Sequence, residues 1–267
     1  MLKQRLLVAI PLIIIVIVLL YTVSVTVFTV IASLLLLYAG WEWSAIAAVR
    51  ELPARIAFLV LLIVCSVIVA CVPAWWPALL GATVVAWAMM FVCCLVYPHM
   101  QRRWARGVAA RVVLGAVCLP VAWWSLVTLF RDAGPSVLLF FLVLVWGADT
   151  GAYAAGRWKG KTPLLPAVSP KKSWEGVLGG AITVLVIGAI GWAVIPTGLP
   201  TNITFWVLVI LTFVFSVIGD LCESLLKRES GVKDSGRLLP GHGGLLDRID
   251  SMIAAAPIFV ACLSLLV

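Results

Sequence analysis

Charged residues are scarce in this chain. Asp, Glu, Lys and Arg together make up 11% of its 267 residues, whereas 64% are hydrophobic and the mean hydropathy is +1.19. Soluble domains have an apolar share of about 45–50%. The composition therefore excludes an ordinary soluble domain and predicts an all-α, polytopic integral membrane protein.

Metal-binding and disulfide patterns are also lacking. The seven cysteines include no Cys-x-x-Cys pair and fall mostly in apolar runs, so they are expected to act as small buried hydrophobic residues. The net charge of +8 requires no nucleic acid, because anionic lipid and membrane orientation account for it. Residues 1–20 are similar to a signal peptide but lack a small-residue cleavage site, which favours a retained first helix.

Apolar runs of about 20 residues, the length that crosses a bilayer, predict about nine transmembrane helices. Their approximate ranges are 6–22, 24–46, 55–72, 76–97, 108–130, 135–156, 174–195, 202–226 and 248–267. With two helices before residue 47, eighteen basic residues share one side of the membrane and only Arg131 lies on the other. The positive-inside rule then places the N-terminus and these loops in the cytoplasm, and predicts a multi-pass protein of a bacterial inner membrane.

The two parts of the chain differ in character. Residues 1–145 form a predicted scaffold of about five helices, in which charge is almost confined to loops. Glu42 is the exception, and we interpret it as a carboxylate near the cytoplasmic end of the second helix, in preference to a catalytic group. The arginines of 98–111 are interpreted as a topology signal. Residues 146–267 form the predicted catalytic region, with about four helices and cytoplasmic loops.

The first polar cluster of the catalytic region spans residues 146–176. Asp149, Tyr153 and Arg157 share one helical face, and a pairing of Asp149 with Arg157 would explain them without a function. The following loop is basic and contains no acid, and Ser173 begins the next helix, whose free N–H groups favour an anion. Because Lys159, Lys161, Lys171 and Lys172 all lie in this loop, it is suited to a polyphosphate.

Two further clusters lie in residues 216–250, which hold six carboxylates and five cationic side chains. Asp220, Glu223 and Lys227 fall on one helical stripe, either as an ion-pair ladder or as oxygen ligands for Mg²⁺. Asp247 and Asp250 begin the last helix on one face, after a glycine-rich loop that can cradle an anion. The residues alone predict a cytoplasm-facing, Mg²⁺-dependent site for phosphate chemistry.

A long gapped motif extends this prediction. It runs from Ser224-x-x-Lys227-Arg228 through Lys233-Asp234-Ser235-Gly236 to Pro240-Gly241-His242-Gly243-Gly244-x-x-Asp247-Arg248-x-Asp250. With every fixed spacing kept, it resembles the signature of the phosphatidate cytidylyltransferase family, also called CDP-diacylglycerol synthases. The segments DTGAYAAGR, SPKKSWEG and GWEWSA are similar to that family too, with Ser173 where a threonine is expected.

The resemblance implies transfer of the cytidylyl group of CTP to phosphatidic acid, giving CDP-diacylglycerol and pyrophosphate in phospholipid biosynthesis. It also implies Mg²⁺, with room for a second, monovalent cation, and a homodimer. The expected catalytic residues are Asp220, Asp247, Lys227, Arg228, Lys233, Asp250 and His242, and the expected metal ligands are Asp220, Asp247 and Glu223. The expected substrate-binding residues are Asp149, Arg157, Lys171, Lys172, Ser173, Ser224, Asp234, Gly243, Gly244 and Arg248.

Two other functions remain open from the residues. A CTP-dependent lipid kinase would use similar helices and carboxylates but would release CDP instead of pyrophosphate. A transporter would carry charge deep within several helices and repeated halves, whereas here the charge gathers on one side of the C-terminal region.

Overall fold

The chain was analysed as a computed structural model that describes residues 2–97, 107–195, 203–236, 238 and 243–264, with side chains placed from residue 11 onward except at 12. Over these residues it forms nine α-helices and one short hairpin. The sequence predicts about nine transmembrane helices, which is near the seven that qualify by length and composition in the described chain. The helices are α1 (Leu2–Thr22), α2 (Val25–Ile46), α3 (Leu52–Cys71), α4 (Trp76–Val96), α5 (Val108–Thr128), α6 (Pro135–Lys159), α7 (Trp174–Val194), α8 (Ile203–Ser230) and α9 (Leu246–Ser264).

Seven helical segments of the described chain are long and apolar enough to cross a membrane. Of the two other helices, α1 is described with its side chains only from residue 11 and includes the apolar stretch Ile13–Thr22. Helix α9 begins with the charged residues Asp247, Arg248 and Asp250. The multi-pass architecture is thus confirmed, with α8 the longest helix at 28 residues.

The long uncharged stretch near the N-terminus is divided into two helices, as predicted. Ser24 adopts an extended conformation between them, and its hydroxyl accepts a hydrogen bond from the backbone N–H of Val27 at 3.4 Å. Because an N-cap side chain satisfies a free N–H of the first turn, one short polar residue starts α2 without any charge.

The loop between α6 and α7 departs from the purely helical expectation. Strands β1 (Pro163–Leu165) and β2 (Ser169–Ser173) pair antiparallel in a two-stranded hairpin. The prolines of this stretch predict an open loop, but the hairpin is held at its turn: Val168 is fully buried and its carbonyl accepts a hydrogen bond from the Arg228 guanidinium at 3.3 Å.

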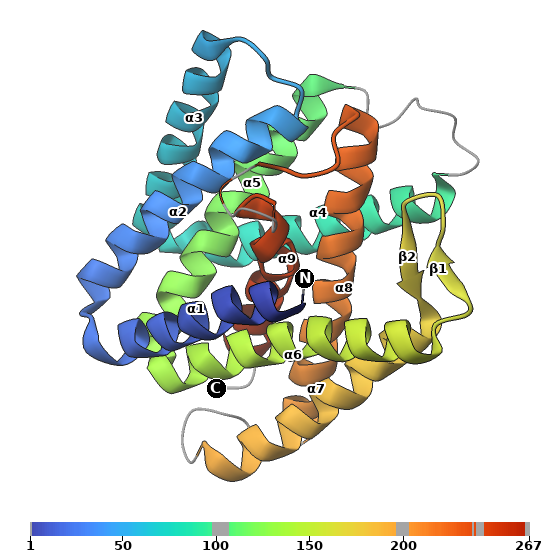
Figure 1. Cartoon of the computed structure of the whole chain (residues 1–267). Helices are drawn as coiled ribbons and strands as arrows, with labels where there is room; N and C mark the ends of the chain where they lie inside the picture. The colour runs from blue at the N-terminus through green and yellow to red at the C-terminus, as the bar shows by residue number, and fades with distance from the viewer. Residues whose placement is uncertain (1, 98–106, 196–202, 237, 239–242, 265–267) are drawn as a thin grey trace.

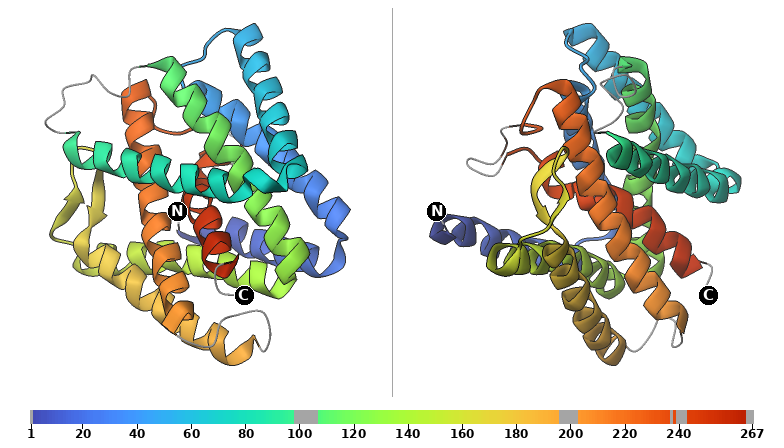
Figure 2. Two further views of the ribbon diagram at one scale, coloured as in Figure 1. Left: turned by 180° about the vertical axis from the view of Figure 1, so that it is seen from behind. Right: turned by 90° about the vertical axis from the view of Figure 1, so that its right-hand side faces the viewer.

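Helix α8 passes between two groups of helices (Figure 1). Helices α6 and α7 pack side by side at one edge, and α2, α3 and α5 lie on the other side, with α9 against α8 (Figure 2). Small residues allow the α6–α7 approach, as predicted: a Cβ on Gly151 would overlap Thr183 and lie 2.9 Å from the Gly179 carbonyl oxygen.

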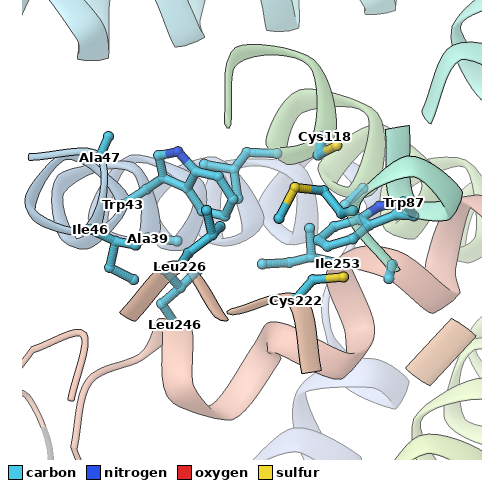
Figure 3. Packing of buried hydrophobic residues seen from close by; sticks show 14 of the residues in the cluster. Ala39, Trp43, Ile46, Ala47, Trp87, Cys118, Cys222, Leu226, Leu246 and Ile253 are labelled. Carbon is cyan, nitrogen blue, oxygen red and sulfur yellow. The ribbon is translucent and has the colours of Figure 1, made fainter. Parts of the chain in front are cut away.

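A buried apolar cluster joins the C-terminal end of α2 to α8 and α9. Trp43 and Ile46 pack with Leu226 and Leu246 (Figure 3), and all four side chains are at most 1% exposed. Cys94 and Cys222 meet in the same cluster with their sulfurs 3.9 Å apart, in agreement with their interpretation as buried hydrophobic residues. Cys71, by contrast, is exposed on the protein surface.

Arg111 corrects one interpretation of the sequence. From the sequence, Arg111 is interpreted as part of the topology signal of 98–111, which would lie at the surface. In the structure Arg111 is in the first turn of α5 and its side chain is only 5% exposed. Its guanidinium donates to the Ile46 carbonyl at 3.2 Å and to the Ser230 hydroxyl at 2.8 Å. Arg111 therefore joins the ends of α2, α5 and α8, and does not face lipid phosphates. The rest of that basic stretch, residues 98–106 with His99, lies outside the described residues.

Candidate active site

The last turns of α8 carry the first part of the site. Asp220, Glu223 and Lys227 share one stripe, as predicted, and the Lys227 ammonium is 2.9 Å from Oε2 of Glu223. Glu223 is only 2% exposed, and its other oxygen, Oε1, is buried without a hydrogen-bond partner among the described residues. An anion buried this deeply needs its cation, so Lys227 is fixed against α8.

Lys227 also reaches the start of α9. Its ammonium is 2.7 Å from Oδ1 of Asp247, which is 20 residues away in the sequence. Oδ2 of Asp247 accepts hydrogen bonds from the backbone N–H of Ser235 at 3.0 Å and of Gly244 at 2.8 Å. Asp247 thereby holds together Lys227, the loop after α8 and the first turn of α9.

The hairpin supplies the next cation. Lys172 on β2 lies 2.6 Å from Oδ2 of Asp220, with a quarter of the lysine side chain and 30% of the aspartate side chain exposed. The Ser224 hydroxyl donates to the other oxygen of Asp220 at 3.5 Å. The structure thus brings Lys172 of the lysine loop together with Asp220, and the hydrogen bond from Arg228 to Val168 explains how the hairpin is held near α8.

Asp149 on α6 adds a carboxylate from a third direction. The Ser251 hydroxyl donates to the Asp149 carboxylate at 3.5 Å. The negative charge of Asp149 is repelled by Asp220 and Asp250 and attracted by Lys172 and Arg248. Asp250 in turn interacts with Asp220 and Glu223. We call Asp149, Asp220, Glu223 and Asp250 the carboxylate cluster. Four acids this close repel one another unless cations share the space.

Arg157 does not pair with Asp149 in the structure. Its guanidinium contacts the Tyr153 hydroxyl instead, at 3.3 Å. The alternative in which Asp149 is merely a partner of Arg157 is therefore wrong. Tyr153 and Arg157 are both exposed, one turn and two turns beyond Asp149.

Ser173 has a structural task where the sequence suggested substrate binding. Its hydroxyl accepts a hydrogen bond from the Gly176 N–H at 3.1 Å and caps α7. The predicted helix start is confirmed.

The other predicted residues surround this core. Gly243 has φ +83° and Gly244 is buried; both precede α9, where the sequence predicts an anion cradle. Exposed side chains at the rim can meet a dissolved ligand; these are Lys171, Arg228, Lys233, Asp234 and Arg248. His242 lies outside the described residues, together with Pro240 and Gly241.

The sequence did not identify the role of Glu42. Instead of facing the cytoplasm at the end of α2, it is 3% exposed and accepts hydrogen bonds from the backbone of Leu245 and Leu246 and from the Ser235 hydroxyl. One signal could have revealed it: GWEWSA places the only charged residue of α2 between two tryptophans.

Comparisons with known proteins decide the family. A model described as the cytidylyltransferase family matches residues 3–266. The chain belongs to this family. The resemblance carried by the motifs is thus confirmed over nearly the whole chain, including the half in which the motifs are sparse.

Individual members of the cytidylyltransferase family give the same result. Phosphatidate cytidylyltransferase of Pseudomonas aeruginosa is 38% identical over 264 residues, which cover 98% of this chain and 97% of that relative. The enzyme of the same name from Haemophilus influenzae is 44% identical over 183 residues, covering 65% of this chain and 64% of the relative. A further relative of that name, from Helicobacter pylori, is 42% identical over 137 residues, about half of each chain.

Proposed function

We propose that this chain transfers the cytidylyl group of CTP to phosphatidate, giving CDP-diacylglycerol and pyrophosphate in phospholipid synthesis. Membership of the cytidylyltransferase family and the names of its relatives support this reaction. The observation that carries the proposal is the site itself: cations and carboxylates from α6, β2, α8 and α9 meet at the polar ends of apolar helices. Such a site can receive a dissolved nucleotide and a membrane lipid together.

The chemical step is an in-line displacement at phosphorus. A phosphate oxygen of phosphatidate forms a bond to the α-phosphorus of CTP, the bond from that phosphorus to the bridging oxygen breaks, and pyrophosphate leaves with the electron pair. The attacking phosphate is already ionised, so the protein need not supply a general base. Most of the catalysis then comes from positioning and charge neutralisation.

Lysine and arginine side chains supply much of that neutralisation. Lys172 and Lys227 are held by carboxylates within 3 Å, so they are aimed before substrate arrives. Lys171, Lys233, Arg228 and Arg248 are exposed around them and can close on the triphosphate or on the lipid phosphate. In each central ion pair, a phosphate oxygen can replace the carboxylate as the partner of the lysine.

The donor set is suitable for Mg²⁺. Carboxylate oxygens are the ligands that this ion prefers, and Oε1 of Glu223 is buried without a hydrogen-bond partner among the described residues. No three Asp, Glu, His or Cys side chains converge with metal-site geometry in the described part of the chain. Asp220 and Glu223, with Asp149 and Asp250 beside them, would hold the ion, and Asp247 would join them by exchanging Lys227. Bound Mg²⁺ would neutralise and orient phosphate oxygens; a second, monovalent cation belongs to the same proposal.

Labelled CTP tests the reaction directly. Purified protein in detergent micelles is given phosphatidic acid and CTP labelled at the α-phosphate, with Mg²⁺ or with a chelator. We expect the label in the lipid phase, one pyrophosphate per transferred group, and no transfer without Mg²⁺. Release of CDP with γ-phosphate transfer would identify a lipid kinase, and absence of Mg²⁺-dependent transfer would overturn the proposal.

We also propose a homodimer in the inner membrane, with the site facing the cytoplasm. The one-sided distribution of basic residues supports the orientation. A membrane-impermeant reagent should modify a cysteine introduced at exposed Lys161 in inverted vesicles but not in intact spheroplasts. Mass measured by light scattering in detergent should be twice 28.7 kDa after subtraction of detergent.

A further inference from the structure

Glu42 is a buried carboxylate with no cation beside it among the described residues. No lysine or arginine of the described chain lies within ion-pair distance of it; its partners are the Leu245 N–H at 3.1 Å, the Leu246 N–H at 2.7 Å and the Ser235 hydroxyl at 3.1 Å. Leu246 is the first residue of α9. Free N–H groups at a helix start favour a negative charge, so Glu42 caps α9 from a helix more than 200 residues away in sequence.

Ser235 links Glu42 to Asp247. The Ser235 hydroxyl donates to Glu42 and accepts from the Asp247 N–H at 3.3 Å, while the Ser235 N–H donates to the Asp247 carboxylate at 3.0 Å. Asp247 then binds Lys227 at 2.7 Å. A continuous set of charge-assisted hydrogen bonds thus runs from α2 in the scaffold half to the lysine at the centre of the site.

The loop has no room to shift around Glu42. A Cβ on Gly236 or Gly244 would overlap the Glu42 carboxylate, so these glycines let the backbone close tightly over it. The same Gly244 donates its N–H to Asp247 at 2.8 Å. The two carboxylates therefore bind successive backbone N–H groups of one short stretch, from Gly244 to Leu246.

Apolar packing holds the same elements together without Glu42. Leu246 lies against Trp43 and Leu226 in the buried cluster (Figure 3), and is completely buried. Loss of the Glu42 charge should therefore leave α9 packed against α2, and should change chiefly the position of the Asp247 carboxylate relative to Lys227.

We propose that Glu42 is a positioning residue of the active site: a carboxylate of the N-terminal half sets the start of α9 and thereby holds Asp247 against Lys227. This inference rests on the proposed function because its test compares the turnover of variants in the CTP assay. The wild-type assay tests the reaction, and variants are compared with that wild type, so the two can fail separately.

Glu42→Gln is the main variant, because glutamine keeps the shape but removes the charge and replaces one acceptor oxygen by a donor. We expect kcat per folded molecule to fall about 10-fold to 100-fold, the size of one or two lost charge-assisted hydrogen bonds, with KM for CTP within about 3-fold. Loss of the cap should also lower the free energy of unfolding, so the folded fraction is measured for each variant. Glu42→Asp, which keeps the charge, should recover part of the lost kcat. Glu51→Gln is the matched control: Glu51 is exposed just beyond α2 and caps nothing with its side chain, so its kcat should stay within about 2-fold.

A second variant tests the route through Ser235. Ser235→Ala alone should lower kcat, and the double variant with Glu42→Gln should fall no more than about 3-fold below the worse single variant, since both act on one unit. Full additivity would overturn the route, and wild-type kcat in Glu42→Gln would overturn the proposal. A loss explained entirely by the amount of folded protein would also overturn it. If Glu42→Gln does not fold, Ser235→Ala decides by the same criteria.

Discussion

Three charged side chains of the N-terminal half bind backbone and hydroxyl groups, whereas the two central lysines of the C-terminal region bind carboxylates. In the N-terminal half, Arg55 donates to the Trp41 carbonyl and the Ser44 hydroxyl, Arg111 donates to the Ile46 carbonyl, and Glu42 accepts from backbone N–H groups. In the C-terminal region, Lys172 and Lys227 bind carboxylates. Bonds to the backbone fix the fold, whereas ion pairs can be exchanged for ligand charges. The side chains of the first group therefore stabilise the fold around the site, and the lysines of the second group can change partners when substrate binds.

The largest effect should follow from removing an exchangeable charge at the centre. Asp247→Asn keeps an acceptor for the loop but loses the negative charge beside Lys227, and should lower Mg²⁺-dependent turnover by about 10²–10³-fold, as for other preorganised electrostatic groups. The assay is initial rate with α-labelled CTP in micelles at saturating substrate. Near-normal turnover in folded Asp247→Asn protein would remove Asp247 from the catalytic set.

A smaller effect is expected at the hairpin. Lys172→Met removes one charge-assisted contact and should raise KM for CTP by about 10-fold or more, since such a hydrogen bond contributes about 1.5–3 kcal/mol. Its exposed neighbour Lys171 provides a comparison, and Lys171→Met should have the weaker effect. Equal effects would mean that the ion pair with Asp220 does not prepare Lys172 for its ligand.

Arg111→Met should separate fold from chemistry. Two hydrogen-bond acceptors at the ends of α2 and α8 would lose their donor, and the free energy of unfolding should fall by about 2–3 kcal/mol. The kcat of the remaining folded protein should stay within about 3-fold. Denaturant titration in detergent, combined with activity per folded molecule, measures both. A large fall in kcat at unchanged stability would place Arg111 with the reacting charges.

The smallest effect should come from the turn between α5 and α6. Arg131 and Asp132 form an ion pair at 2.7 Å with about half of each side chain exposed, and exposed pairs contribute about 0–1 kcal/mol. Asp132→Asn should change neither the unfolding midpoint measurably nor the turnover. A clear loss of activity would show that charge matters there too, and would break the distinction between the two halves.

What the sequence predicted depends on the range of each interaction. The helices follow from apolar runs and turn spacing, and so does the pairing of Glu223 with Lys227, which are one turn apart. Lys172 with Asp220 and Glu42 with Leu246 could not be predicted, because these pairs are set by how α2, α8, α9 and the hairpin pack. The hairpin was missed for a related reason: its turn is held by Arg228, 60 residues further along the chain.

The length of α8 has a consequence for where the lipid reacts. At 1.5 Å per residue its 28 residues extend about 42 Å, whereas the hydrocarbon layer is about 30 Å thick. Counted from Ile203, about 20 residues cross that layer and end near Cys222, so Asp220 and Glu223 lie on either side of its boundary with the lipid headgroups. A phosphatidate molecule can present its phosphate there while its acyl chains stay in their own leaflet, and only the nucleotide has to arrive from water.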